Sequence, residues 1–369
     1  MVKIDIFGDF LATHPEIIQF EKDVSSLLER ADFNVVNFEA PVAGVGNPIR
    51  KSGKNLNQPI ASAYLLKEKG FNVFLLANNH MMDYGEDAVL KTKSAFEGCL
   101  SLGAGTAQEA YEVKIIEKEG CKIGLLSLVH KEFGVLEDKT SKGIGTAWVC
   151  SVDIKPIIEE VSSRVDYLLV FPHAGLENAD IPLPEWRNLY KRFIDWGASA
   201  VIGSHPHAPQ GWEEYKGFPI FYSLGNFYFD ILSGGPYWNN SLMVKLYLDE
   251  TLRYEVESLK FNPQEGIIDY DKSNAIAEHT RSICDILKNN TAYNVAIEQL
   301  CSVTYKDYIY GFLRGLGGTT LKVGPLKFMK MLAHMLLNHA DETYLLNAFQ
   351  CETHRWVIER ALRNIVRNK

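Results

Sequence analysis

Five short apolar runs in this chain end in residues of the kinds that bind metal ions. The runs lie at residues 2–7, 33–37, 72–76, 166–171 and 198–202. Their length and composition predict buried strands. Helical spacing of apolar residues predicts helices between them, at residues 15–30, 60–69 and 86–96. Strands that alternate with helices predict an α/β fold, in which sites lie beyond the carboxyl ends of the strands.

The residues that follow these runs are carboxylates, imidazoles and an amide. They are Asp9, Glu39, Asn79, His80, His173, His205 and His207. Such groups are ligands for Mn, Fe, Zn, Ni or Co. Each also has an ordinary structural role open to it, such as a cap for Asp9 or a turn for Asn79. Their recurrence after five predicted strands favours a metal site, in which two ions could share Glu39 and act in a phosphoryl transfer.

Other residues near these motifs receive different interpretations. Asp83 follows the Asn-His pair and is predicted to cap the helix at residues 86–96. The remaining histidines lack the context of a predicted strand that leads into a site and are left out of it: His14, His130, His279, His334, His339 and His354.

A glycine-rich loop at residues 44–57 carries three cationic side chains, Arg50, Lys51 and Lys54. It is either a solvated surface loop or a segment that grips an anionic substrate, since point charges on flexible stems suit phosphate. We count the three side chains as candidates for substrate binding.

The bulk composition is that of an ordinary soluble globular protein. Of the 369 residues, 46% are hydrophobic and 23% are charged, and the net charge is -8. This balance argues against a general nucleic-acid binder. The six cysteines are scattered and predict reduced thiols rather than disulfides. The first residues enter a strand pattern without the apolar core of a signal peptide, and no apolar stretch is long enough to span a membrane, so we expect a cytoplasmic protein.

The composition changes near residue 270, where helical periodicity replaces β-type alternation. We therefore expect two parts, residues 1–265 with the predicted site and residues 270–369 as a helical C-terminal region. The last helix carries an apolar stripe, Ile358, Ala361, Leu362 and Ile365, beside a basic face. The stripe favours a helix docked on the core, and a membrane-surface or partner helix is the alternative.

The motifs together resemble the bacterial CapA family of capsule-synthesis or poly-γ-glutamate biosynthesis proteins. The resemblance runs in order from residue 1 to about residue 265 and excludes the helical C-terminus. It rests on Gly8-Asp9, Asn37-Phe38-Glu39-Ala40-Pro41, residues 77–85, Gly103-Ala104-Gly105, residues 172–177, Gly203-Ser204-His205-Pro206-His207 and residues 222–227.

That family is related to the calcineurin-like metallophosphoesterases, so the resemblance implies a four-layer αββα sandwich and a two-metal site. It implies that Asn79, His173 and His205 bind one ion, that Asp9 and His207 bind the other, and that Glu39 binds both. The ions would be divalent, with Mn, Zn or Fe the candidates. His80 would then face the substrate as general acid or charge stabiliser.

The chain departs from the wider superfamily at two positions. Leu11 stands where a histidine usually follows the first aspartate, and the bridging carboxylate is the longer Glu39. The first metal site therefore loses a ligand. Glu213 and Asn226 are candidates to support it, as ligands, as neighbours of ligands or in contact with substrate.

The leading functional hypothesis is a divalent-metal-dependent phosphatase or phosphodiesterase of capsule or cell-envelope polymer biosynthesis. Its partners would be a phosphorylated or anionic substrate and a capsule-synthesis machinery. Two alternatives remain open. One is a non-catalytic accessory protein that binds an anionic polymer or intermediate, which the Leu11 position favours. The other is a metal-dependent amide or ester hydrolase that acts on poly-glutamate.

Overall fold

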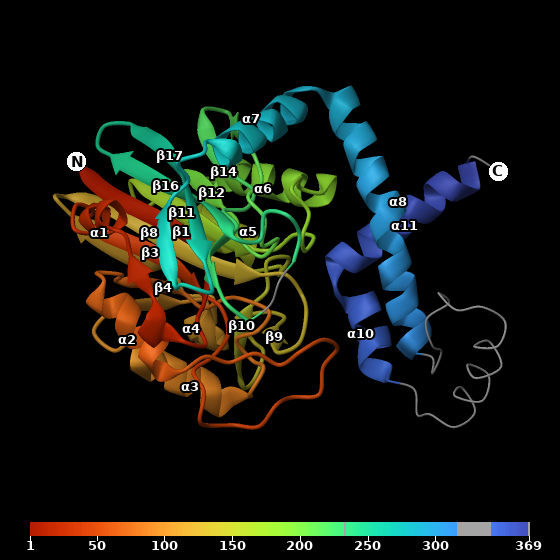
Figure 1. Ribbon diagram of the computed structural model, residues 1–369, viewed down its shortest axis with the longest axis horizontal. Helices are drawn as coiled ribbons and strands as arrows, with labels where there is room; N and C mark the ends of the chain where they lie inside the picture. The colour runs from red at the N-terminus through yellow and green to blue at the C-terminus, as the bar shows by residue number, and fades with distance from the viewer. Residues whose placement is uncertain (232–233, 316–340, 368–369) are drawn as a thin grey trace.

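Two β-sheets lie face to face in the computed structural model, which describes residues 1–231, 234–315 and 341–367 (Figure 1). The larger sheet has the order β2-β18-β17-β16-β1-β3-β4-β5, and β15 also pairs with β1. Its strands are β1 Val2–Leu11, β2 Gln19–Phe20, β3 Phe33–Phe38, β4 Val73–Leu75, β5 Leu100–Leu102, β15 Asn226–Phe229, β16 Asn240–Leu248, β17 Leu252–Asn262 and β18 Ile267–Tyr270.

The second sheet has the order β13-β14-β12-β11-β8-β7. Its strands are β7 Lys114–Lys118, β8 Cys121–Val129, β11 Tyr167–His173, β12 Ala200–Ile202, β13 Trp212–Tyr215 and β14 Phe218–Phe221. A small third sheet pairs β6 Ala104–Thr106, β10 Ile144–Ala147 and β9 Val135–Leu136. In the two main sheets, β1 is parallel to β3, and β8, β11 and β12 are parallel to one another.

Helices cover the outer faces of both main sheets. The helices of the described residues are η1 Pro15–Ile17, α1 Lys22–Leu28, α2 Ile60–Glu68, α3 Glu86–Ala95, α4 Ala107–Ala110, α5 Ile154–Ser162, α6 Pro184–Trp196 and the C-terminal α7 Ala275–Lys288, α8 Asn290–Gly315, α10 Glu342–Gln350 and α11 Glu352–Arg367. One buried cluster joins α1, α2 and α3 to the larger sheet, and another joins α5 and α6 to the smaller one. The predicted α/β class and the four-layer αββα arrangement are confirmed.

Strands in the middle of this sandwich are apolar on both faces. In β1, Ile4 and Ile6 lie in the cluster between the two sheets, whereas Phe7 lies in the cluster under the helices. Successive side chains of a strand point to opposite faces, so burial on both sides requires a nearly continuous apolar run. This is why the predicted strands were recognisable as short apolar runs.

The predicted helix at residues 15–30 is wrong in its first half. The structure has the short turn η1, the strand β2 and only then α1. Phe20 packs against the cluster under the helices, and β2 pairs in parallel with β18, with Phe20 opposite Ile268. A strand partner from far along the chain overrides the local helical spacing.

The C-terminal helices pack at one end of the sandwich (Figure 1). In α11 the buried apolar residues are Val357 and Ala361, which join the cluster around α6, and the ring of Trp356 lies 4.9 Å from that of Trp186. Leu362 and Ile365 of the predicted stripe stay exposed. The last helix is therefore docked on the core as predicted, but through a face that shares only Ala361 with the predicted stripe.

Among the described residues, none of the helices has the length and apolar character needed to cross a membrane. Strand β18 lies between the two predicted parts of the chain, and the helical region begins with α7.

The buried carboxyl of Asp5, in the larger sheet, lowers stability at neutral pH. Asp5 on β1 is 6% exposed, and burial raises its pKa from 3.8 to about 6 although Lys245 and Lys3 lie nearby. The folded state thus holds this proton more tightly than the unfolded state, so stability falls as pH rises from about 4 to about 6, by ~3 kcal/mol. We expect Asp5→Asn to be the more stable form above pH 6, with the gain shrinking toward pH 4, in urea unfolding.

The exposed Asp285→Asn serves as the control and should follow the wild type at every pH. The same pH dependence in Asp5→Asn and in the wild type would contradict the prediction.

Candidate metal centre

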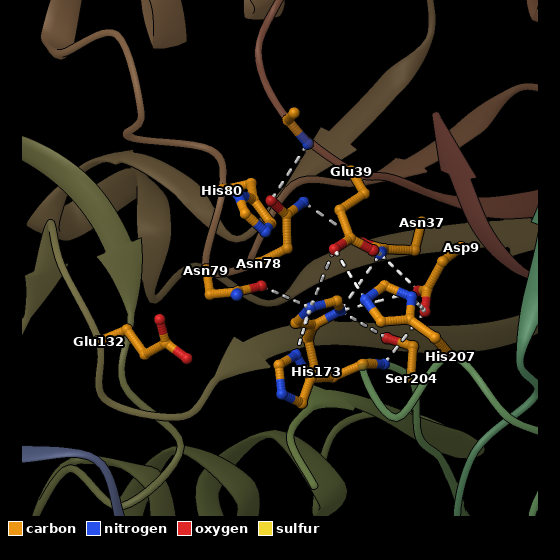
Figure 2. Close-up of polar contacts among 12 residues, drawn as sticks. Asp9, Asn37, Glu39, Asn78, Asn79, His80, Glu132, His173, Ser204 and His207 are labelled. Atoms are coloured by element: carbon orange, nitrogen blue, oxygen red, sulfur yellow. Dashed lines mark hydrogen bonds and ion pairs between the residues drawn. The ribbon is translucent and has the colours of Figure 1, made fainter. Parts of the chain in front are cut away.

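The predicted ligands come together where the carboxyl ends of the strands of both sheets meet (Figure 2). Asp9 lies on β1 and Glu39 follows β3, whereas His173 ends β11 and the His205–His207 turn follows β12. The backbone N–H of His205 donates to Oδ2 of Asp9 at 3.2 Å, which links the two sheets directly at this point. Strands brought together by the fold thus place five residues from distant parts of the sequence in one buried group.

Asp9 lies at the centre of this group and is fully buried. Its Oδ2 is 3.5 Å from Nδ1 of His207, and its Oδ1 is 3.8 Å from Nδ1 of His173. The amide of Asn37 donates to Oδ1 at 2.7 Å. These contacts fix the carboxylate and direct it at two imidazoles.

Glu39 provides the strongest evidence that a cation fits here. Its side chain is fully buried, and Oε1 has no hydrogen-bond partner among the described residues. This oxygen lies 3.6 Å from Nε2 of His207 and 3.9 Å from Nε2 of His173. Asp9, Glu39 and His173 each offer a ligand atom, and these atoms lie within 4.8 Å of one another. A buried carboxylate oxygen without a donor is costly, and a divalent cation would satisfy it.

Burial sets the protonation of the whole group. It raises the pKa of Asp9 to about 7 and, together with the Asp9 carboxylate, raises the pKa of Glu39 well above its usual range. It lowers the pKa of His207 to about 4, and those of His173 and His205 well below their usual range. Burial disfavours charge on both kinds of group, so neutral imidazoles are available as ligands.

The His205–His207 turn holds its two imidazoles with an uncommon backbone. His205 has φ 98° and His207 has φ 57°, both in the left-handed region. For residues other than glycine this conformation costs roughly 1–2 kcal/mol each. Gly203 precedes the turn, and a Cβ there would lie 2.2 Å from the carbonyl oxygen of Tyr222. Gly203 therefore lets the chain after β12 pass close to Tyr222, which follows β14, and the turn then directs both imidazole rings inward.

Two amide side chains complete the surroundings of the imidazoles. Oδ1 of Asn79 lies 3.0 Å from Nε2 of His173. Oδ1 of Asn226, on β15, lies 2.8 Å from Nδ1 of His207. Asn226 can therefore hold the His207 ring so that Nε2 faces Glu39, which is the supporting role considered for it.

Leu11 and Glu213 contribute no ligand to this group. Leu11 is fully buried in the apolar cluster under the helices. Glu213 accepts from Nε and Nη2 of Arg187, both at 2.7 Å, and from the hydroxyl of Tyr222. It lies opposite Ile220, which packs toward α6. Glu213 thus points to the helix-covered face of the sheet rather than to the strand ends, and the prediction of a supporting or substrate-binding role for it is wrong.

His80 is held at the edge of the group by Asp83. Nδ1 of His80 lies 2.6 Å from Oδ2 of Asp83, and Asp83 also accepts from the backbone N–H of Leu56 and from Nζ of Lys51. The helix α3 begins after Gly85 without a side-chain cap, so the predicted capping role of Asp83 is wrong. Asp83 instead fixes the His80 ring, which leaves Nε2 available to a ligand.

The three cations of the 44–57 loop have different surroundings. The Lys51 side chain is 2% exposed and forms the buried ion pair with Asp83. Lys54 lies in the wall of a cavity of about 410 Å³, together with Asn79 and His80. Arg50 is exposed and pairs with Glu342 of α10 at 2.6 Å. Of the three, Lys51 and Lys54 border this cavity, and Arg50 joins the loop to the C-terminal helices.

The same cavity reveals residues that the sequence analysis did not select. His130 and Glu132 line it next to His205, and α8, α10 and α11 contribute Tyr308, Asn347 and His354 to the opposite wall. His130 directly follows β8, so the rule that found the other ligands also applied to it. Tyr308, Asn347 and His354 lie on helices and do not follow a strand, so that rule could not find them.

Comparison with known proteins points to one family. The family model described as bacterial capsule synthesis protein PGA_cap matches residues 11–231. The capsule biosynthesis protein CapA of Bacillus anthracis is 30% identical over 261 residues, 66% of this chain and 61% of that protein. The PGA biosynthesis protein CapA of Bacillus subtilis (strain 168) is 31% identical over 248 residues, 63% of this chain and 62% of that protein. The chain spans about three fifths of the length of these relatives.

Solved structures show more distant similarity. A hypothetical protein from Thermus thermophilus matches with a TM-score of 0.45 and 17% identity, over 71% of this chain and all of that one. The 5′-nucleotidase from Candida albicans SC5314 matches with a TM-score of 0.42 and 11% identity, over 77% of this chain and 58% of that one.

Glu39→Gln tests whether the unpartnered carboxylate holds a cation. Loss of even an outer partner of a metal site typically costs roughly 10- to 100-fold in affinity, so we expect at least about 100-fold weaker Mn²⁺ or Zn²⁺ binding in calorimetric titration. The cation-free variant should fold normally. Burial raises the pKa of the Glu39 carboxyl and so favours its neutral form, which a neutral amide resembles.

Asp5→Asn is the matched control, since it removes a buried carboxyl from the same sheet that is not among the proposed ligands. It should bind the metal like the wild type. Wild-type affinity in Glu39→Gln would refute the assignment of Glu39 as a ligand.

Proposed function

The chain belongs to the PGA_cap family of bacterial capsule synthesis proteins, and from this premise we propose that it is a divalent-metal-dependent phosphoester hydrolase of capsule or cell-envelope polymer biosynthesis. The observation that carries the proposal is the unsatisfied Glu39 oxygen among buried imidazoles, beside a cavity bordered by His80 and Lys54. Such a site combines metal ligands with groups that suit a phosphoryl anion.

The residues that would hold the cations come from both sheets. They are Asp9, Glu39, Asn79, His173, His205 and His207. When bound, divalent cations supply Lewis-acid catalysis and a nucleophile at neutral pH. Carboxylate and imidazole ligands suit Mn, Zn or Fe.

His80 is assigned as the general acid that protonates the leaving oxygen. Its Nδ1 faces the Asp83 carboxylate, which orients the ring and keeps Nε2 on the cavity side. Lys51 pairs with the other oxygen of Asp83, and its Nζ lies 3.3 Å from Nδ1 of His80, so we assign it an action on the substrate through these two side chains. Asp83 and Lys51 are thus positioning residues in this proposal.

Lys54 is assigned to bind the anionic part of the substrate, because it borders the cavity that His80 also lines. Arg50, whose guanidinium pairs with Glu342, is assigned to the contact between the loop and α10 instead. The substrate class is a phosphorylated small molecule or polymer of the capsule pathway, and the partner would be the capsule-synthesis machinery.

A binding role without hydrolysis is the second candidate. The burial of Leu11 at the position of a usual ligand favours it, because one cation then has fewer protein ligands. In that role the cations and Lys54 would hold an anionic polymer or intermediate, and His80 would be dispensable. A metal-dependent amide or ester hydrolase of poly-glutamate would need the same ligands and a different preference for substrate.

His80→Ala separates these roles. With Mn²⁺-loaded protein and p-nitrophenyl phosphate or bis-p-nitrophenyl phosphate, we expect kcat to fall on the order of 100- to 10,000-fold, because a general acid contributes about that much. Metal affinity should stay unchanged. His14→Ala removes an exposed histidine and should keep wild-type kinetics.

Absence of phosphoester cleavage by the metal-loaded wild type would overturn the hydrolase proposal. Anionic polymer that binds equally to the wild type and to His80→Ala would then support the binding role, and release of glutamate from poly-glutamate would support the amide hydrolase.

A further inference from the structure

His130 and Glu132 form, with His205, a second group of possible metal ligands beside the buried one. Each residue offers one ligand atom, and the three atoms lie within 4.8 Å of one another. The group shares no residue with Asp9, Glu39 and His173, which meet the same criterion. The described residues therefore contain two adjacent sets of three ligands.

His130 is a buried imidazole whose close polar neighbour is a carboxylate. It is 1% exposed, and neither Nδ1 nor Nε2 has a hydrogen-bond partner among the described residues. Nε2 lies 3.2 Å from Oε1 of Glu132, so the two groups form an ion pair when the ring is protonated. The same separation fits two ligand atoms of one ion, which would take the place of the proton.

His205 connects the two groups. Its ring centre lies 4.2 Å from that of His130 and 4.9 Å from that of His173, and its Nδ1 is 3.2 Å from Nε2 of His173. Figure 2 shows Glu132 on the cavity side of the buried group, with its carboxylate directed toward it. The second group is thus continuous with the first and opens toward the cavity.

The start of the loop that carries His130 and Glu132 is fixed by two backbone hydrogen bonds. The backbone N–H of His130 donates to the carbonyl oxygen of His173 at 3.1 Å. The backbone N–H of Lys131, between the two ligands, donates to Oε2 of Glu352 at 3.0 Å, and Nε1 of Trp148 donates to Oε1 of Glu352 at 2.7 Å. Glu352 opens α11 and is 2% exposed. The C-terminal region therefore positions this loop.

We propose that His130, Glu132 and His205 form a divalent-cation site on the cavity side of the buried centre, with Glu352 as the residue that positions its loop. Three protein ligands facing a cavity leave a coordination position for an anionic ligand, as catalytic sites do. Two imidazoles and a carboxylate suit Zn²⁺, Mn²⁺ or Fe²⁺. This site would serve the same reaction as the proposed function. Its role toward a phosphoester therefore rests on that proposed function.

The test is titration of the cation-free protein with Co²⁺, followed by its visible absorption, in the absence of substrate. We expect the wild type to bind two equivalents, one at the buried centre around Asp9 and Glu39 and one at the group of His130, Glu132 and His205. In His130→Ala and Glu132→Gln one equivalent should be lost or bind at least about tenfold more weakly, and the other should be retained. Glu352→Gln should weaken the same equivalent, and its far-UV circular dichroism should match the wild type.

His279→Ala is the matched control, because His279 is a partly buried histidine 3.4 Å from the Asp180 carboxylate and does not line the cavity. It should bind two equivalents. Glu132→Gln keeps the test decisive if His130→Ala fails to fold, because the Glu132 side chain is at the cavity wall and 10% exposed.

Two equivalents of unchanged affinity in Glu132→Gln, or in a folded His130→Ala, would overturn the proposal. This outcome is separate from failure of the proposed function. Loss of one Co²⁺ equivalent without any phosphoester cleavage by the wild type would support the site and refute the hydrolase. Phosphoester cleavage by the wild type, together with metal binding that does not depend on His130 and Glu132, would support the hydrolase and refute the site.

Discussion

The burial of Glu39 without a hydrogen-bond donor on Oε1 is the constraint on which the rest of the centre depends. Ionised carboxylates in a protein interior are costly unless charge or hydrogen bonds compensate for the lost water. Asp9 receives donors from Asn37 and from the His205 backbone. Glu39 Oε1 receives none among the described residues, so in the absence of a cation a proton is the remaining way to neutralise it. Metal binding and protonation of the centre are therefore two solutions to the same desolvation problem.

The geometry of the centre follows from how the sheets stack. Asp9 and Glu39 come from the larger sheet, and His173 and His205 from the smaller one. The separation of the ligands is thus set by the apolar layer between the sheets, where residues such as Ile6 and Leu169 pack. A change of volume in that layer would alter the ligand distances although it touches no ligand, because packed interiors transmit small displacements.

The sequence allowed most of the centre to be predicted, because ligands at strand ends are a local signal. His130 directly follows β8 and was missed, because no strand that leads into a site had been predicted before it. Glu213 was wrongly included, because its position shortly after His207 says nothing of the face on which it points. Asp83 was assigned to a cap, whereas its partner Lys51 lies 32 residues earlier in the chain. Strand ends are encoded locally, but side-chain partners depend on which distant segments pack together.

The C-terminal helices show this limit most clearly. Their apolar periodicity predicted docking, but the residues that determine what they dock against are polar. Thr353 donates to the carbonyl oxygen of Gly175 and accepts from Nε1 of Trp186, and Glu352 holds Lys131. All three contacts are made by the first turn of α11, and two of them reach loops beside the centre. A helix held only by its apolar face could shift by one turn with little loss of stability. Buried hydrogen bonds of this kind form only when the helix is in one register. The first turn of α11, rather than its apolar face, therefore fixes the helical region as a wall of the cavity.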